Sequence, residues 1–511
     1  MRHVPVLIVG GSLVGLSASL FLRHHNVPHL LIDKHRGSAA HPRAMGFTET
    51  TMEHYRACGI ADRIPQNDPG ARLRRVQVES LFSDWVAETD WTPGEPSDRS
   101  AALSPCTGAA IAQDELEPIL RAAAIEAGAQ LSLGVELTDL TQDEDRATAT
   151  VRHRDDGIQE TIEADWVIAC DGADSTIREG LGIARSGVGH LRTVRSVLFR
   201  CPDADVVLDR GAQQFEIEQP GFKAFLTTYG DGRWVLMFDD DRERNTEELR
   251  AAVQRALGRD LPFEIVTTGK WELAGRIAEE YRRGRIFLAG DAAHQLPPTR
   301  GGFGANTGID DVWNLAWKLA AVLGGRADVG LLDTYHAERR PIGWLRHQQT
   351  FSRPDYAHWA PSTFRPEPLF GNDAMEFGQL NRSTAVRGAG PDLPAAAPPK
   401  VWAGQPGTRA PHVWEDGEEG TRSTLDLFGR DYVLLSANRA WIDLGERLSI
   451  DAVMVGRGFR FPAGQPFAAM FGVSGAGATL VRPDGIVAWR SQKLPDAGAE
   501  ASIRRLIAAR G

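Results

Sequence analysis

Three short motifs in this chain place a glycine, a carboxylate or both directly after an apolar run. They are "VLIVGGSLVG" with the later "LLID", "WVIACDGADSTIR" and "IFLAGDAAH", and their carboxylates are Asp33, Asp171 and Asp291. A glycine-rich turn in front of a helix lets backbone amides approach an anion, because no side chain keeps the ligand away. A carboxylate at the end of a strand can accept hydrogen bonds from sugar hydroxyls. These residue types in this order predict a nucleotide-like ligand held against bare backbone.

The first motif is predicted to form a βαβ unit. The apolar run from Val6 to Val9 is a strand, the next apolar spacing is a helix, and a second strand runs from His29 to Ile32. Gly10 permits the tight turn, and Gly15 lets the helix close on the strand. Ser12 stands where the dinucleotide fingerprint has its middle glycine, so its side chain narrows the approach to a phosphate, although its hydroxyl could donate a hydrogen bond. The alternative is a glycine turn that merely packs.

The other two motifs repeat the pattern along the chain. A strand from Trp166 to Ala169 leads to the second carboxylate, after which Ser175 and Arg178 open a helix. A strand from Ile286 to Ala289 leads to the third carboxylate. Capping of a helix would explain any one of the three. All three in this order favour the carboxyl edge of a parallel sheet, where ligands of open α/β folds bind.

Composition narrows the class of protein. The chain has 511 residues, of which 42% are hydrophobic and 24% charged, with a net charge of -11. No basic surplus is present to neutralise phosphates, so we expect no nucleic-acid partner. The start lacks the pattern of a signal peptide and no run of about 18 apolar residues occurs, so we expect a cytoplasmic protein without a membrane partner. No CxxC occurs among the cysteines, which disfavours a metal site, a disulfide framework or a dithiol centre: Cys58, Cys106, Cys170 and Cys201.

Together with "AGDAAHQLPPTRGGFGANTGIDDVWNLAWKLA", the motifs resemble those of the flavin-dependent aromatic hydroxylases of the para-hydroxybenzoate hydroxylase type. Within that family the sequence is most similar to bacterial polyketide hydroxylases, such as aklavinone and tetracenomycin hydroxylases. The resemblance covers roughly residues 1 to 350 by motif and extends more loosely to the C-terminus. It implies FAD as the cofactor and NADPH or NADH as the co-substrate.

The resemblance also implies which residues would lie along the cofactor, although it identifies no catalytic residue and no metal ligand. The expected cofactor-binding residues are Gly10, Ser12, Leu13, Gly15, Asp33, Arg43, Gln113, Leu137, Asp171, Asp291, Pro298, Gly302, Gly304 and Asn306. Among them, Arg43 would reach the phosphates or the ribityl region, Gln113 the ribityl chain, and Leu137 the adenine. The family places Pro-Pro-Thr directly before Gly-Gly, whereas here Arg300 intervenes, so the proline or glycine nearest the reactive carbon is left open.

The loop before the helix that begins near Thr307 would seat the flavin ring. Its amides can face the N1 and O2 side, where negative charge develops on reduction, and its prolines would form an apolar wall. The helix itself is expected to be amphipathic, with core residues at Leu315, Leu319 and Val322. In the next predicted helix, Arg339 and Arg340 are expected to be solvated or paired locally.

The expected fold class is α/β, with a Rossmann-like FAD-binding domain and a mostly antiparallel middle domain. The resemblance to the polyketide hydroxylases further implies a thioredoxin-like C-terminal domain. The expected divisions are 1–185 for the first part of the FAD-binding domain, 186–272 for the substrate domain, 273–387 for the second part with its helices, 388–400 for a Pro/Ala-rich linker, and 401–511 for the C-terminal domain. A turn is expected at Pro483-Asp484-Gly485. Tyr229 and His190 are candidate polar contacts for the substrate.

The expected activity is a monooxygenase reaction that consumes NAD(P)H and oxygen. It would hydroxylate a polycyclic aromatic polyketide through a flavin C4a-hydroperoxide. Two alternatives stay open: oxygen insertion or ring cleavage on a related quinone or ketone, and a flavin-binding protein that sequesters an intermediate without turnover. A homodimer is also left open.

Overall fold

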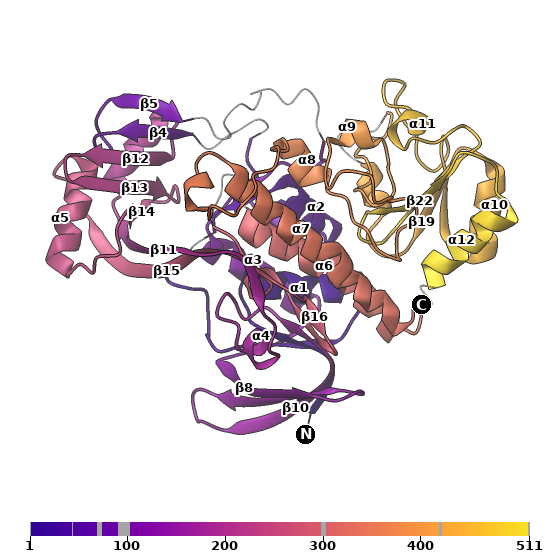
Figure 1. Ribbon diagram of the computed structural model, residues 1–511, viewed down its shortest axis with the longest axis horizontal. Coiled ribbons are helices and arrows are strands. Elements are labelled where there is room, and N and C mark those ends of the chain that lie inside the picture. The colour runs from indigo at the N-terminus through magenta and orange to yellow at the C-terminus, as the bar shows by residue number, and fades with distance from the viewer. Residues whose placement is uncertain are drawn as a thin grey trace.

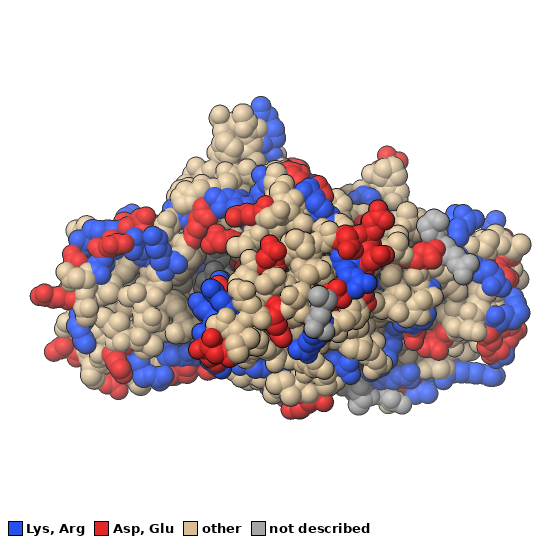
Figure 2. Space-filling model, turned by 90° about the horizontal axis from the view of Figure 1, so that it is seen from below, with Lys and Arg blue, Asp and Glu red and all other residues tan. Residues whose placement is uncertain are grey.

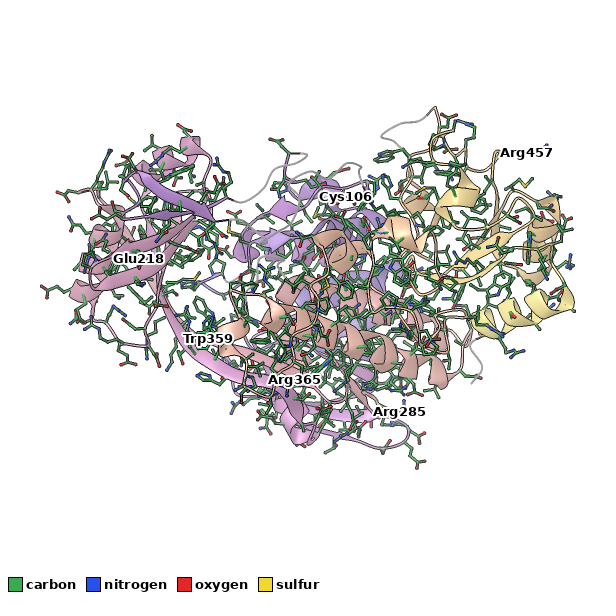
Figure 3. All side chains as sticks on the ribbon, turned by 45° about the horizontal axis from the view of Figure 1, so that its top comes forward. Cys106, Glu218, Arg285, Trp359, Arg365 and Arg457 are labelled. Carbon is green, nitrogen blue, oxygen red and sulfur yellow. The ribbon has the colours of Figure 1, made fainter. Side chains whose placement is uncertain are left out.

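A computed structural model describes residues 2–42, 44–68, 74–89, 103–297, 303–417 and 422–508. Figure 1 shows three lobes in a row. The lobe on the left is an antiparallel sheet with one helix, the centre holds a parallel sheet covered by long helices, and the lobe on the right is the C-terminal domain. In Figure 3, Glu218 and Arg457 mark the two outer lobes, and Cys106 lies between them.

The central sheet is the Rossmann-like part of the molecule. Its strand order is β16-β17-β10-β1-β2-β7, and the pairs β17/β10, β10/β1, β1/β2 and β2/β7 are parallel. Helices lie on it, so its strands are nearly continuous apolar runs. The strands are β1 (Arg2–Val9), β2 (His29–Asp33), β7 (Gln130–Leu133), β10 (Gln159–Ala169), β16 (Arg282–Arg283) and β17 (Ile286–Leu288), with β8 (Val135–Gln142) and β9 (Ala147–His153) continuing from β10.

The predicted βαβ unit is confirmed. Helix α1 (Leu13–His24) joins β1 to β2, and β1 begins earlier than predicted because Arg2 and His3 also pair with β10. The other helices of the central body are α2 (Glu49–Ala57), α3 (Gln113–Glu126), α4 (Thr176–Gly180), α6 (Phe303–Leu323), α7 (Asp333–Ser352) and α8 (Asn372–Phe377).

Helix α6 is not amphipathic in the predicted sense. Leu315 and Leu319 are buried as expected and Val322 is partly buried, but Asp311, Asn314 and Lys318 are buried too. The spacing of these three polar residues places them along one face. That face is covered because α7 and the C-terminal domain both contact it: Asn314 Nδ2 donates to Glu338 and to Asp484. A helix buried all round has no solvated side, and its polar residues must find partners inside the protein.

The second sheet builds the left lobe. Its order is β18-β15-β11-β14-β13-β12-β4-β5, with α5 (Thr246–Leu257) packed on it. Three aromatic side chains, Phe215, Trp234 and Phe238, are buried in its core. The strands are β4 (Arg75–Val78), β5 (Trp85–Thr89), β11 (Arg185–Arg200), β12 (Gln214–Gln219), β13 (Phe222–Thr228), β14 (Arg233–Phe238), β15 (Glu264–Ala278) and β18 (His294–Gln295).

This sheet extends beyond the range 186–272. It takes β4 and β5 from a segment that the sequence analysis assigned to the first part of the FAD-binding domain, and β4 pairs in parallel with β12. Strand β15 continues to Ala278, and β18 adds His294, the last residue of the third motif, and Gln295. The lobe is therefore assembled from separate parts of the chain, which alternating polarity within one segment does not reveal.

The C-terminal domain is thioredoxin-like, as the resemblance implies. Its order is β20-β19-β21-β22, with β19 and β20 parallel and the other pairs antiparallel. The expected turn at Pro483-Asp484-Gly485 joins β21 to β22. The elements are β19 (Val433–Ser436), α10 (Arg439–Leu448), β20 (Asp451–Met454), α11 (Phe467–Met470), β21 (Ala478–Val481), β22 (Val487–Ser491) and α12 (Ala497–Ala508).

The stretch 388–400 is a packed connection rather than a free linker. Ala396 and Ala397 are buried, Ala396 forms a bridge with Gln379, and α9 (Pro399–Trp402) begins within it. Proline-rich composition alone predicted a spacer, but its alanines are small enough to pack closely against the protein.

Candidate functional site

The three predicted turns meet at one edge of the central sheet. Because β17, β10 and β1 are neighbours in parallel, the chain after each strand emerges at the same carboxyl edge. Cys170 N donates to Val9 O at 2.8 Å, and Ala289 N donates to Ala169 O at 3.0 Å, so the registers bring the turns level with each other. Figure 2 shows a recess between the left lobe and the central body, with basic side chains at its border.

The first turn depends on two glycines. Gly10 has φ +108, and a Cβ there would lie 2.2 Å from Cys170 O. A Cβ at Gly15 would lie 1.8 Å from Gly10 O. Neither position can carry a side chain, so α1 closes tightly on the strand and Leu13 begins the helix with its first amides uncovered. This bare helix start fits the pyrophosphate of a dinucleotide.

Ser12 and Gln113, two residues expected at the cofactor, contact each other. Gln113 Nε2 donates to Ser12 Oγ at 2.9 Å, and Ser12 Oγ donates to Glu117 Oε1 at 2.6 Å. Gln113 Nε2 also lies 2.8 Å from Glu117 Oε1. The hydroxyl is therefore used inside the protein rather than aimed at a phosphate. Sequence reasoning missed Glu117, although its spacing from Gln113 on α3 places both on one helix face.

Asp33 lies against the first turn. Its Oδ2 accepts a hydrogen bond from Gly11 N, and its Oδ1 accepts one from His35 N, each at 2.5 Å. The carboxylate is held at the end of β2 by backbone donors. That placement next to the turn agrees with the position expected for a group near the adenosine ribose.

The second turn contains an oxygen without a partner. Asp171 Oδ2 accepts from Ile177 N at 3.3 Å, but Oδ1 is buried and meets no donor among the residues that the structure describes. Burial raises the pKa of Asp171. An orphaned buried acceptor calls for a further donor, which a bound ligand or water can supply. Ser175 caps α4 as predicted, accepting from Arg178 N.

Arg178 joins the second turn to the third. Its side chain is buried, and Nη1 donates to Ala173 O at 3.0 Å and to Ala292 O at 3.3 Å. One guanidinium thus holds the backbone of two turns that lie more than a hundred residues apart in the chain. The sequence predicted that Arg178 lies at the start of a helix, but it did not predict the contact with Ala292 in the third turn.

The third turn is held by Asp311 from α6. Asp311 Oδ2 accepts from Gly290 N at 3.2 Å and lies 2.6 Å from His294 Nε2, while Oδ1 accepts from Arg339 Nε at 2.8 Å. Burial alone would raise the pKa of Asp311, but His294 and Arg339 hold it below its ordinary value. The expectation that Arg339 is solvated or paired locally is wrong: it is buried because its partner is on another helix.

The remaining expected residues occupy different surroundings. Asn306 ties α6 to the start of α2, since its Oδ1 accepts from Thr51 Oγ1 at 2.7 Å and its Nδ2 donates to Gly46 O at 3.1 Å. A Cβ at Gly304 would meet open space. Asp291 follows Gly290 in the third turn and is partly exposed, while Leu137 packs partly buried against the central core. Three expected residues lie outside the described residues: Arg43, Pro298 and Gly302.

Neither candidate substrate contact is free. Tyr229 Oη donates to Pro42 O at 2.6 Å, and His190 Nδ1 lies 2.6 Å from Glu272 Oε1. Tyr229 therefore ties the second sheet to the loop before α2.

A cavity of about 110 Å³ lies elsewhere, between α2, α6, α8 and the C-terminal domain. His54, Trp313 and Asp484 are among its lining residues, and none of the expected cofactor residues is. The His54 ring stacks on Trp313 with centroids 4.8 Å apart. This cavity belongs to the domain interface rather than to the three turns.

Comparison with known proteins decides the family. The family model described as "FAD binding domain" matches residues 3–350, and that described as "Aromatic-ring hydroxylase, C-terminal" matches residues 403–509. The chain belongs to the FAD-dependent aromatic hydroxylases. Its similarity to both parts of these hydroxylases confirms the resemblance inferred from the motifs, and the chain is an enzyme of the flavin monooxygenase class.

Individual hydroxylases match along nearly their whole length. The tetracenomycin A2 monooxygenase-dioxygenase of Streptomyces glaucescens is 38% identical, covering 99% of this chain and 97% of that protein. The 4-methyl-5-nitrocatechol 5-monooxygenase of a Burkholderia species is 36% identical, covering 99% of this chain and 98% of that protein. Among solved structures, aklavinone-11 hydroxylase in a ternary complex with FAD and aklavinone matches with a TM-score of 0.87 at 32% identity, covering 99% of each chain.

In the part of the chain that the structure describes, no helix is both long enough and apolar enough to cross a membrane.

Proposed function

We propose that this chain is an NAD(P)H-consuming monooxygenase that uses FAD to hydroxylate a polycyclic aromatic polyketide. The observation that carries the proposal is the meeting of three turns at one sheet edge, each with glycine or a buried carboxylate where a dinucleotide would lie. When bound, FAD would accept electrons from NAD(P)H and carry activated oxygen as a flavin hydroperoxide. The chain's own residues bind, orient and shield that cofactor.

Each turn has a proposed part in holding FAD. The amides after Gly10 would bind the pyrophosphate, and Asp33 would accept from the adenosine ribose. The orphaned Oδ1 of Asp171 and the partly exposed Asp291 would accept hydrogen bonds from cofactor hydroxyls. Ser12 and Gln113 would shape the pocket through Glu117, because their polar atoms bond to each other.

An arginine beside the second turn supports a second nucleotide. Arg185 Nη1 donates to Ala173 O at 3.2 Å. Burial, followed by the charges of Arg178 and Arg276, lowers the pKa of Arg185. A partly desolvated guanidinium among other cations gains from an anionic ligand. The phosphates of NADPH or NADH would supply that anion next to the flavin turns.

The substrate class rests on the family and on the second sheet. The aklavinone complex holds a fused-ring substrate, whereas the Burkholderia relative is named for a single-ring nitrocatechol. The long pair β11 and β15 leads from the left lobe to the third turn through β18, so this sheet would form one wall of the substrate site. A test panel must therefore contain both anthracycline-like and single-ring phenols.

The first test is the visible absorption spectrum of the purified protein, followed by NADPH and NADH oxidation with each phenol. A bound flavin whose reduction is accelerated by one aromatic class, with one atom of labelled oxygen in a hydroxylated product, supports the proposal. A product with an enlarged or opened ring would favour oxygen insertion, and absence of stimulated oxidation would favour a sequestering protein. A colourless protein that does not take up FAD would contradict the cofactor assignment.

A matched pair of variants tests the site itself. Asp291→Asn removes the charge in the third turn, and Asp174→Asn removes an exposed charge beside the second turn. We expect the first to weaken FAD binding at least about tenfold, or about 1.4 kcal/mol, and the second to leave it unchanged. Equal FAD affinity in both variants would remove Asp291 from the cofactor site.

A further inference from the structure

One turn of the C-terminal domain contacts the helices that support the third cofactor turn. The residues from Arg482 to Gly485 join β21 to β22 and reach α6 in the central body. Trp313 Nε1 donates to Asp484 O at 3.2 Å, and Asn314 Nδ2 donates to Asp484 Oδ2 at 3.2 Å. The Arg482 side chain has no exposed surface. This turn is therefore buried between the domains, although its sequence is typical of an exposed hairpin.

Arg482 is part of a fully buried charge cluster. Its Nη1 donates to Glu338 Oε1 at 2.6 Å and its Nη2 to Glu338 Oε2 at 3.0 Å. Lys318 Nζ on α6 donates to the same Oε2 at 2.9 Å, and Asp484 accepts from Arg482. Burial would raise the pKa of Glu338, but Arg482 and Lys318 hold it well below its ordinary range. Glu338 is thus a buried carboxylate that needs both cations.

The next residue of α7 leads to the cofactor turn. Arg339 follows Glu338 directly and donates to Asp311, and Asp311 holds both Gly290 N and His294. Two adjacent side chains of one helix therefore carry two separate buried ion pairs. One pair binds the C-terminal domain, and the other fixes the turn that contains the predicted cofactor carboxylate.

We propose that the C-terminal domain is part of the apparatus that positions the third cofactor turn, with Arg482 acting as a positioning residue through Glu338 and the Arg339–Asp311 pair. This inference rests on the proposed place of Asp291 at the flavin. It gives a role to a domain that lacks cysteines and contributes none of the three turns.

The physical basis is the cost of separating buried charges. If α7 moves relative to the C-terminal domain, Glu338 loses Arg482 in a place where water cannot replace it. The same movement changes the distance from Arg339 to Asp311, because Glu338 and Arg339 are consecutive residues of one rigid helix. With Arg482 in place, the Glu338–Arg482 and Arg339–Asp311 pairs hold α7 against the C-terminal domain and against α6. Asp311 then holds Gly290 and His294 in a fixed position.

The test compares two arginines at the same domain interface. Arg482→Met breaks the buried pair, whereas Arg326→Met breaks the pair with Asp431, whose two side chains are 55% and 56% exposed. Hydrogen–deuterium exchange is measured on the full chain, with and without added FAD, for the amides of residues 289–296. We expect exchange there to accelerate at least about tenfold in R482M and to stay within about twofold of the unchanged protein in R326M.

A second measurement reads the cofactor directly. The FAD dissociation constant, followed by flavin fluorescence, is expected to rise at least about fivefold in R482M but not in R326M, and the visible flavin bands are expected to shift only in R482M. Faster exchange confined to residues 310–320, 335–342 and 478–490, with unchanged exchange at 289–296 and unchanged FAD binding, would overturn the proposal and leave the cluster as interface packing alone.

Two further variants keep the test decisive if R482M does not fold. R482K retains the positive charge but has a single donor nitrogen, so it cannot bond to both oxygens of Glu338 in the way that the guanidinium does. E338Q keeps the shape of the acceptor without its charge. Each is expected to accelerate exchange at 289–296 less than R482M would, and no acceleration in either overturns the proposal. The FAD-free arm is readable even if the chain hydroxylates nothing, so failure of the proposed activity and failure of this inference give different results.

Discussion

His294 Nε2 and Asp311 Oδ2 lie 2.6 Å apart, and neither side chain has exposed surface. Asp311 comes from α6, whereas His294 follows the third cofactor turn. Because the same carboxylate also accepts from Gly290 N, one buried charge fixes the turn at two points. The position of the predicted cofactor carboxylate therefore depends on a residue that does not belong to the turn.

Asp311→Asn should weaken both the fold and the cofactor site. The amide keeps the shape but removes the carboxylate that Arg339 bonds to, so that only Asp310 Oδ2, 3.9 Å from Arg339 Nη2, is left as a counter-charge. We expect this change to cost about 3 kcal/mol of unfolding free energy. FAD release should also accelerate, because Gly290 and His294 lose their charged anchor. Denaturant unfolding and flavin release are the measurements. Asp333→Asn is the control, since Asp333 is 78% exposed in its pair with Arg282; an equal loss in that variant would contradict the assignment.

Gly15→Ala should disrupt the first turn. The added Cβ would lie 1.8 Å from Gly10 O, so α1 must move away from the strand. We expect a loss of about 3 kcal/mol or more in unfolding free energy, with loss of bound FAD. Gly37→Ala serves as the comparison, because a Cβ there meets nothing within 4 Å. A G15A protein with normal stability and normal flavin content would refute this account of the turn.

Ser12→Ala should weaken FAD binding indirectly. The hydroxyl bonds to Gln113 and Glu117, so its loss leaves the Glu117 carboxylate with one donor fewer beside the pyrophosphate turn. We expect the FAD dissociation constant, measured by fluorescence titration, to rise about tenfold, which is about 1.4 kcal/mol. Ser502→Ala on α12, a partly exposed site in the C-terminal domain, should leave FAD binding unchanged. Tighter FAD binding in S12A would show that the serine obstructs the phosphate instead.

Acid should destabilise the protein through His29, which is buried in β2. Burial lowers its pKa from 6.5 to about 4. Between pH 6.5 and about pH 4 the unfolded chain therefore binds a proton at His29 that the folded protein does not bind. The contribution of neutral His29 to the free energy of unfolding is fully present above pH 6.5 and is lost on acidification toward pH 4.

His29→Gln removes this contribution. Between about pH 7.5 and about pH 5.5, we expect the unchanged protein to lose about 1 kcal/mol more unfolding free energy than H29Q. Denaturant titrations at the two pH values measure the difference. His358→Gln, at an exposed position, should follow the unchanged protein. Parallel pH curves for H29Q and the unchanged protein would exclude His29 as a source of acid sensitivity.

The sequence predicted the elements whose form depends on nearby residues. The strand before Gly10 follows from an apolar run. The turn and the helix after it follow from close backbone contacts that only glycine permits. The cap of α4 at Ser175 and the turn at Pro483-Asp484-Gly485 are equally local. Strand-end carboxylates at Asp171 and Asp291 were found because parallel strands end at one edge. These signals fixed the family and the outline of the site.

Other features could not be predicted, because they depend on which distant segment covers a surface. The pattern of α6 has a polar side, and only packing against α7 and the C-terminal domain turns Asn314 and Lys318 into buried partners of Glu338. Strand β4 could join the second sheet only through its pairing with β12.

By itself, the sequence determined the strands, turns and helix starts around the three motifs and the kind of cofactor they suit. The tertiary structure alone decided the partners of the charged residues. Arg339 was expected to be solvated or paired locally, but it is buried and bonds to Asp311 on another helix. Ser12 was expected near a phosphate, but its hydroxyl bonds to Glu117. The physical reason is that a charged or polar group gains little from a partner in water but must have one when buried, and burial depends on contacts between residues far apart in the chain.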